Sequence, residues 1–165
     1  MQKYELFLEE FDNKLEKYIS SHQVFLCCKK GCSACCEKGD YPLSEIELKY
    51  LMQGFISLEN DLKIKVQQNF KNMFPGGTCP FLVNKECSIY SYRPIVCRVH
   101  GLAYLVEKGV VKLPYCVNTG KNYSNQYVNK EFIGEPIKEN LDTYKVLSDF
   151  DFGPIKNLYD WIKSS

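Results

Sequence analysis

Nine cysteines are the residues of this sequence whose type and spacing most directly suggest chemistry. Five lie between residues 27 and 36, in the run Cys27-Cys28-Lys-Lys-Gly-Cys32-Ser-Ala-Cys35-Cys36, and the others are Cys79, Cys87, Cys97 and Cys116. Cys32 and Cys35 form a C-x-x-C unit, in which one tight turn directs two thiolates at one metal ion. Because adjacent side chains diverge along the backbone, we expect Cys35 and Cys36 to serve different metals or different corners of one cluster. The later cysteines can join them only after folding, so the sequence predicts a metal site coupled to stability.

Composition and charge exclude several other classes of function. The 165 residues are 45% apolar, and 21 basic against 20 acidic residues leave a formal charge of +1. A nucleic-acid partner would call for a basic excess, so we expect none. No apolar run approaches the ~18 residues of a membrane span, and the N-terminus has no secretory h-region. We therefore expect a cytoplasmic protein without a membrane partner, in which reductants keep thiols free for metal binding.

Familiar metal-binding templates fit the cysteine spacing poorly. A zinc ribbon needs a second C-x-x-C unit, which the later cysteines do not provide. A bacterial ferredoxin run has two residues between its first cysteines and a proline after its last, and neither is present. The spacing Cys28-x3-Cys32-x2-Cys35 matches the cradle of radical S-adenosylmethionine enzymes, but the sequence lacks the repeated βα pattern of their barrel.

Taken together, the motifs resemble a known family, the YkgJ-type cysteine-cluster proteins (C-x-x-C-x-x-C-C), whose domain is described as chelating zinc or iron. The resemblance lies in Gly31-Cys-Ser-Ala-Cys-Cys, in Cys79-Pro-Phe-Leu, in Cys87-Ser-Ile-Tyr and in Arg93-Pro-x-x-Cys-Arg, and it spans about residues 28–116. It implies metal binding, often described as iron–sulfur, and no established reaction. The family's eight cysteines map to Cys28, Cys32, Cys35, Cys36, Cys79, Cys87, Cys97 and Cys116. Cys27 is then the extra thiol, although either Cys27 or Cys28 fits the start of the motif.

Two arginines flank Cys97 and are candidates for balancing the charge of the metal centre. Four thiolates leave a zinc ion or a [4Fe–4S]²⁺ cluster with about two negative charges, which nearby hydrogen-bond donors stabilise. Arg93 and Arg98 can supply such donors, and the alternative is that they form ordinary surface ion pairs. No Ser/His/Asp set, glycine-rich phosphate loop or carboxylate pair is present, so the catalytic residues of any reaction are unknown.

The elements that must position these residues indicate a mainly α-helical protein with a small β-hairpin. We expect one compact domain over residues 1–165, with a cysteine-bound metal core at about 27–116 between terminal helices. Apolar spacing predicts helices at about 3–20 and 58–73, and prolines at the first helical position indicate helices at about 136–148 and 154–163. We expect a further helix at about 45–54 and a hairpin at 103–106 and 110–113. The polar, turn-rich residues 117–130 indicate an exposed loop or a ligand-free connector. Ser44 and Glu47 form a capping box that starts the second helix.

Three hypotheses of function follow. The first is a metal-binding protein that holds zinc or an iron–sulfur cluster in one or two sites, with a redox or electron-transfer role. The second is an enzyme of unknown substrate that uses the same metal. The third is a structural zinc module that presents a surface to a protein partner.

Overall fold

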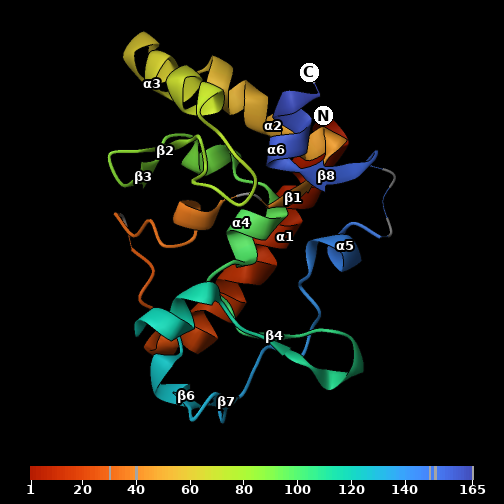
Figure 1. Cartoon of the computed structure of the whole chain (residues 1–165). Helices are drawn as coiled ribbons and strands as arrows, with labels where there is room; N and C mark the ends of the chain where they lie inside the picture. Colours follow the sequence, from red (N-terminus) through yellow and green to blue (C-terminus); the bar gives the residue numbers. More distant parts are fainter. Residues whose placement is uncertain (30, 40, 149, 151, 165) are drawn as a thin grey trace. The chain divides into compact units, whose positions relative to one another are not determined.

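The structure is a computed structural model that describes residues 1–29, 31–39, 41–148, 150 and 152–164 (Figure 1). The chain forms two compact units, and each is described by itself. Unit 1 consists of Met1–Cys28 and Val99–Asp149, and unit 2 consists of Lys29–Arg98 and Phe150–Ser165. The single domain expected from the sequence stays a prediction. Helices and small antiparallel strand pairs make up both units, which confirms a mainly α-helical fold.

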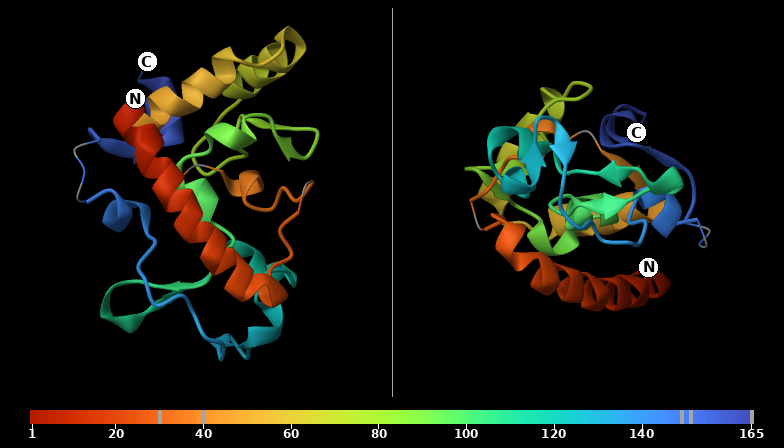
Figure 2. Two further views of the ribbon diagram at one scale, coloured as in Figure 1. Left: turned by 180° about the vertical axis from the view of Figure 1, so that it is seen from behind. Right: turned by 90° about the horizontal axis from the view of Figure 1, so that it is seen from below.

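A long amphipathic helix begins unit 1. Helix α1, Gln2–His22, is the continuous red helix in Figure 2, and it confirms the helix predicted at 3–20. Its buried side chains recur at three- and four-residue steps, so one stripe of the helix faces a core. These side chains are Tyr4, Leu8, Phe11 and Leu15.

Two short hairpins and a short helix complete unit 1. Strands β4 (Tyr104–Leu105) and β5 (Val111–Lys112) pair antiparallel, which confirms the predicted hairpin with shorter strands. Strands β6 (Tyr127–Val128) and β7 (Glu131–Phe132) form a hairpin that the sequence pattern did not indicate. Single turns of 3-10 helix connect the elements of this unit: η1 (Gln23–Phe25), η4 (Glu107–Gly109), η5 (Tyr115–Thr119) and η6 (Ser124–Gln126).

Two expectations for unit 1 are wrong. Only Thr143–Val146 (α5) is helical within the predicted helix 136–148. Tertiary pairing overrides local propensity there, because the Ile137 N–H donates to the Ala103 carbonyl and the Ile137 carbonyl accepts from Leu105. The segment 117–130 is not an exposed loop either, since Asn122 and Tyr123 are each 1% exposed.

Unit 2 contains two predicted helices and one apolar core. Helix α2 (Glu45–Ile56) and helix α3 (Asn60–Lys71) confirm the predicted helices, with the second shorter at both ends. Val66 of α3 is fully buried, whereas Ile64, which lies off the apolar stripe, is 53% exposed. The buried residues of the core come from both helices, the cysteine segments and the C-terminus: Leu43, Leu51, Val66, Met73, Phe81, Val83, Ile89, Leu158 and Trp161.

The C-terminal segment of unit 2 differs from its prediction. Strand β1 (Pro42–Ser44) pairs antiparallel with β8 (Ile155–Asn157), so the helix expected at 154–163 begins only at Leu158 as α6 (Leu158–Lys163). The Trp161 indole N–H donates to the Leu43 carbonyl at 2.9 Å, and this hydrogen bond joins α6 to β1. Backbone pairing along residues 155–157 therefore replaces the first helical turn.

The capping box at the start of α2 is confirmed and has an additional partner. The Ser44 side chain accepts from the Glu47 N–H, and the Glu47 carboxylate accepts from the Ser44 N–H at 2.7 Å. The other carboxylate oxygen accepts from the Ile95 N–H at 2.9 Å. Ile95 begins helix α4 (Ile95–Val99), so one fully buried carboxylate caps the start of two helices.

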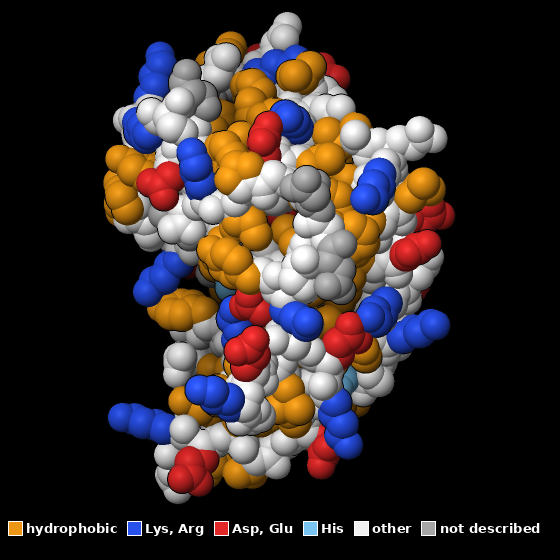
Figure 3. Space-filling view, turned by 90° about the vertical axis from the view of Figure 1, so that its right-hand side faces the viewer, with side chains coloured by type: hydrophobic (Ala, Val, Ile, Leu, Met, Phe, Trp, Pro, Cys, Tyr) orange, Lys and Arg blue, Asp and Glu red, His pale blue; other side chains and the backbone are white. Residues whose placement is uncertain are grey.

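The surface and the helices add two observations. On the face drawn in Figure 3, lysine and arginine side chains are interspersed with aspartate and glutamate. Among the residues that the structure describes, no helix has the length and apolar character required to cross a membrane.

Candidate metal centre

Close backbone pairing brings the first and second cysteine segments of unit 2 together. The Cys79 N–H donates to the Cys36 carbonyl at 2.7 Å, and the Gly39 N–H donates to the Gly77 carbonyl at 2.9 Å. A Cβ atom on Gly39 would lie 2.3 Å from the Cβ of Cys79, so only glycine permits this approach. Cys36 begins the 3-10 turn η2 (Cys36–Lys38), which follows Cys35 directly.

Cys87 and Cys97 come from elements that follow these segments. Cys87 ends strand β3 (Glu86–Cys87), which pairs with β2 (Leu82–Val83), and Cys97 lies in the middle of α4. The 3-10 turn η3 (Tyr90–Tyr92) links β3 to α4. We call the set Cys35, Cys36, Cys79, Cys87 and Cys97 the five-thiol cluster, because each of its members interacts electrostatically with another.

The two adjacent thiols of this cluster lie closer together than we expected. The Sγ atoms of Cys35 and Cys36 are 4.0 Å apart, so their side chains do not diverge. In a tetrahedral zinc site with Zn–S bonds of about 2.3 Å, sulfurs lie ~3.8 Å apart. The observed separation of 4.0 Å is close to this value.

The ionisation of the cluster depends on a cation. The hydrogen bond with Cys36 and burial raise the pKa of Cys35 far above its ordinary value, and burial raises the pKa of Cys87 and of Cys97. For Cys36, the hydrogen bond with Cys35 lowers the pKa, but the hydrogen bond with Cys79 and burial outweigh it and bring the pKa to about 12. These thiols stay protonated by themselves, and a bound metal cation would supply the charge that converts them to thiolates. The donor set thus fits zinc or iron.

Of the two predicted arginines, Arg93 acts electrostatically on the cluster. Its positive charge lowers the pKa of Cys35, Cys87 and Cys97, against the larger effect of burial. The guanidinium lies 3.5 Å from the centre of the Tyr90 ring and donates from Nε to the Tyr90 carbonyl at 2.9 Å. These contacts hold the Arg93 charge in place.

Arg98 makes a different set of contacts. Its Nε donates to the Arg93 carbonyl at 2.8 Å, and its Nη2 donates to the Ser91 carbonyl at 3.2 Å. Arg98 therefore braces the loop that carries Arg93. Its predicted role toward the metal stays a prediction.

Sequence reasoning missed a tyrosine beside the cluster. The Tyr41 hydroxyl donates to the Cys35 carbonyl at 2.9 Å, and burial together with the charges of Cys35, Cys97, Cys36 and Cys79 raises its pKa. Tyr41 stands outside every cysteine motif, so no spacing signal indicated it.

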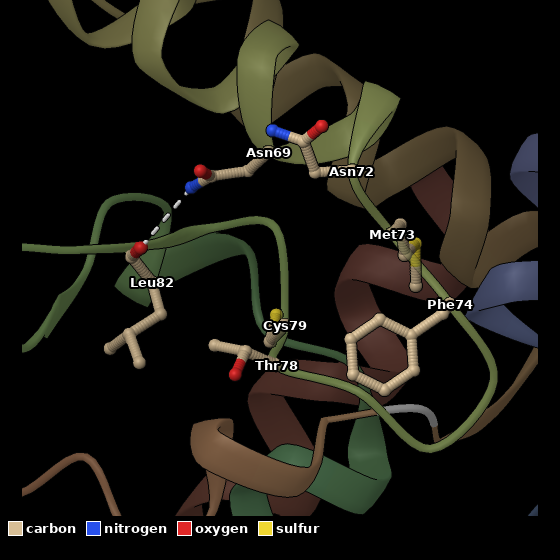
Figure 4. A pocket seen from close by; sticks show the side chains of 7 residues that line it. All are labelled: Asn69, Asn72, Met73, Phe74, Thr78, Cys79 and Leu82. Carbon is tan, nitrogen blue, oxygen red and sulfur yellow. Dashed lines mark hydrogen bonds between the residues drawn. The ribbon is translucent and has the colours of Figure 1, made fainter.

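A small pocket opens beside one thiol of the cluster (Figure 4). Its volume is about 160 Å³, and its lining includes Asn69, Asn72, Met73 and Cys79. The Asn69 amide is held in place because its Nδ2 donates to the Pro80 and Leu82 carbonyls. A small molecule in this pocket would lie against Cys79.

The other three predicted ligands are Cys32 of unit 2 and Cys28 and Cys116 of unit 1. Cys32 is half-buried in the turn after Gly31, whose φ of 85° favours glycine, and its N–H donates to the Lys29 carbonyl. Cys28 and Cys116 belong to unit 1, where Cys28 is exposed and Cys116 is buried. Within the described parts of the chain, no group of three or more His, Cys, Asp or Glu side chains is placed so that it could hold a metal ion. The eight-cysteine ligand set therefore stays a prediction.

The fold and the cluster define a class of mainly helical, cysteine-rich proteins whose thiols are suited to a metal ion. Residues 27–129 match the model of the CxxCxxCC family, which is described as a putative zinc- or iron-chelating domain. Since the match covers more than half of the sequence, the chain belongs to this family. No curated protein and no solved structure matches the chain.

Proposed function

We propose that this protein binds zinc or an iron centre through thiolates, and that the five-thiol cluster of unit 2 provides one complete site. The observation that carries the proposal is the convergence of five thiols in unit 2, four of which have a pKa raised by hydrogen bonds between the thiols or by burial. Four thiolates satisfy a zinc ion or a [4Fe–4S] cluster, so the cluster holds enough ligands for either. Cys28, Cys32 and Cys116 are the remaining members of the proposed eight-cysteine set.

Arg93 supports the same site from outside the ligand set. A metal with four thiolates has about two negative charges, and the guanidinium charge beside three of the thiols offsets part of them. A closed site of this kind suits a structural zinc ion or an electron-transfer cluster. The bound cation would supply the charge that keeps the buried sulfurs deprotonated.

The test is elemental and sulfide analysis of protein purified without oxygen, together with its visible spectrum. Zinc or iron should be present at one or two sites per chain, and Cys36→Ser and Cys97→Ser should each lower the content. Cys27→Ser is the matched control, since Cys27 is the extra cysteine, and it should leave the metal content nearly unchanged. A metal-free chain that is well folded when purified without oxygen would refute the proposal.

A second candidate function is a metal-dependent enzyme, and the pocket beside Cys79 favours it. The pocket would give a small molecule access to one edge of the metal site. An enzyme needs an open coordination position, whereas a structural or electron-transfer site has its ligands complete. X-ray absorption spectra of the loaded protein distinguish the two, because a light oxygen or nitrogen ligand beside the sulfurs indicates an open position.

A further inference from the structure

A buried amide in unit 1 contacts both residues of the Cys27-Cys28 pair. The Asn122 side chain is 1% exposed, and its Oδ1 accepts from the Cys27 N–H at 2.7 Å. Its Nδ2 donates to the Gly101 carbonyl at 2.8 Å and to the Cys28 Sγ at 3.0 Å. Both amide protons of Asn122 therefore form hydrogen bonds, and one of them is donated to the sulfur of Cys28, which is an exposed residue.

We propose that Asn122 is a positioning residue that fixes the Cys28 sulfur, and not that of Cys27, as a metal ligand. The inference rests on the proposed function, because it assigns a role toward the bound metal. Hydrogen-bond donors to the ligand atoms are a common feature of metal sites, and the Asn122 amide is such a donor to the Cys28 sulfur at 3.0 Å. The thiolate is the form that binds a metal, and a donor on its sulfur also holds the side chain in one orientation.

The same amide distinguishes the two adjacent cysteines. It holds Cys27 through the backbone N–H and Cys28 through the side chain. The pair thus has a fixed register, in which the sulfur of Cys28 is the one that the buried donor orients. This register resolves the choice between Cys27 and Cys28 that the spacing leaves open.

Gly101 is an independent sign that the contact is built into the fold. A Cβ atom at this position would lie 2.8 Å from the Cys28 Sγ and 2.9 Å from the Asn122 Nδ2. Real Cβ atoms do not approach other atoms so closely, so any other residue would push the sulfur and the amide apart. The absence of a side chain at residue 101 leaves room for this hydrogen bond.

The direct test is NMR of ¹⁵N-labelled protein loaded with ¹¹³Cd²⁺, which occupies thiolate sites and has a nuclear spin. An N–H···S–Cd hydrogen bond transmits scalar coupling from cadmium to the amide proton. A hydrogen bond to a sulfur that does not bind cadmium transmits no such coupling. We expect one Asn122 Nδ2 proton to couple to ¹¹³Cd, and the coupling to vanish in Cys28→Ala but remain in Cys27→Ala. Thiolate-bound cadmium without coupling to Asn122, or coupling that survives Cys28→Ala, would overturn the inference and leave metal binding intact. Failure of the chain to bind cadmium at all would overturn the proposed function, and this inference with it.

Metal release to a chelator supplies a second readout. Asn122→Ala should release metal ~10–100-fold faster, as expected when a hydrogen-bond partner of a ligand is removed. Asn118→Ala is the matched control, because Asn118 lies on the same segment and is exposed. In a Cys28→Ala background the effect of Asn122→Ala should disappear, whereas a purely structural effect would persist and contradict the inference. Should Asn122→Ala fail to fold, the NMR measurement on the wild-type chain still decides.

Discussion

Replacing Glu47 with glutamine should destabilise unit 2 strongly although it changes only one atom. The carboxylate is fully buried and accepts from the Ser44 N–H, the Ser44 hydroxyl and the Ile95 N–H. A glutamine presents one oxygen and one NH₂ group, so in either orientation a donor faces a donor. A buried N–H left without its acceptor costs about 1–3 kcal/mol, and lost hydrogen bonds to a charged group add to this. We expect Glu47→Gln to lower the free energy of unfolding by about 2–4 kcal/mol.

The assay is urea unfolding of the metal-free and metal-loaded protein, followed by circular dichroism. Glu45→Gln is the matched control, since Glu45 begins the same helix and its 2.6 Å pair with Lys49 is exposed. Such a surface pair contributes about 0.3–0.5 kcal/mol. Because α4 carries Cys97 two residues after Ile95, Glu47→Gln should also speed metal release. A stability within 0.5 kcal/mol of the control, on the scale of a surface pair, would refute the reasoning.

Three further predictions concern charge, pH and close packing. Arg93→Gln should speed metal release to a chelator by ~10-fold or more, because the Arg93 charge acts on three of the thiols. Arg98→Gln should speed it by less, because Arg98 donates to the Arg93 and Ser91 carbonyls. Wild-type release rates in both variants would contradict this reasoning. Burial and the charge of Lys112 lower the pKa of His100 to about 4, below the value of about 6.5 in the unfolded chain. As the pH falls, the unfolded state therefore binds the proton first. The free energy of unfolding, measured by urea unfolding, should fall by about 2–3 kcal/mol between about pH 6.5 and 4. An equal fall in His100→Gln would show that another group is the cause. Gly39→Ala should lower the metal content and reduce the free energy of unfolding by about 1–3 kcal/mol, because the added Cβ would meet Cys79. A thermal midpoint equal to that of the wild type would show that the backbone relaxes freely and would contradict this prediction.

The sequence predicted the elements that depend on patterns of residues close together in the chain. The stripe of α1 and the Ser44–Glu47 capping box are short-range patterns, and both are confirmed. The hairpin β2–β3 was missed because its turn uses Asn84-Lys85 at φ values of 53° and 64°, where a glycine would have marked the turn. Residues 136–148 were wrongly predicted as a helix because Ile137 pairs with residues more than thirty positions earlier.

The cysteines of the candidate site were predictable from the sequence, and the residues around them were not. Cysteine spacing indicated the thiols, and the structure brings Cys35, Cys36, Cys79, Cys87 and Cys97 together. Tyr41 and Asn122 have no motif, since each contacts a cysteine segment only through the folded backbone. The polar composition of residues 117–130 indicated an exposed loop, so the burial of the Asn122 amide in this segment was not predicted.

The pairing of β1 with β8 has a consequence for the order in which the chain is synthesised. Residues 42–44 leave the ribosome more than a hundred positions before residues 155–157, their only strand partners among the described residues. At about 5–20 residues per second, β8 and Trp161 are synthesised roughly 6–24 seconds after β1 and its Leu43 carbonyl. Unit 2 therefore closes only after residues 155–161 have been synthesised, although all of its cysteines have emerged long before. A chain stopped at residue 149 would carry every thiol of the cluster and still lack the segment that covers its core.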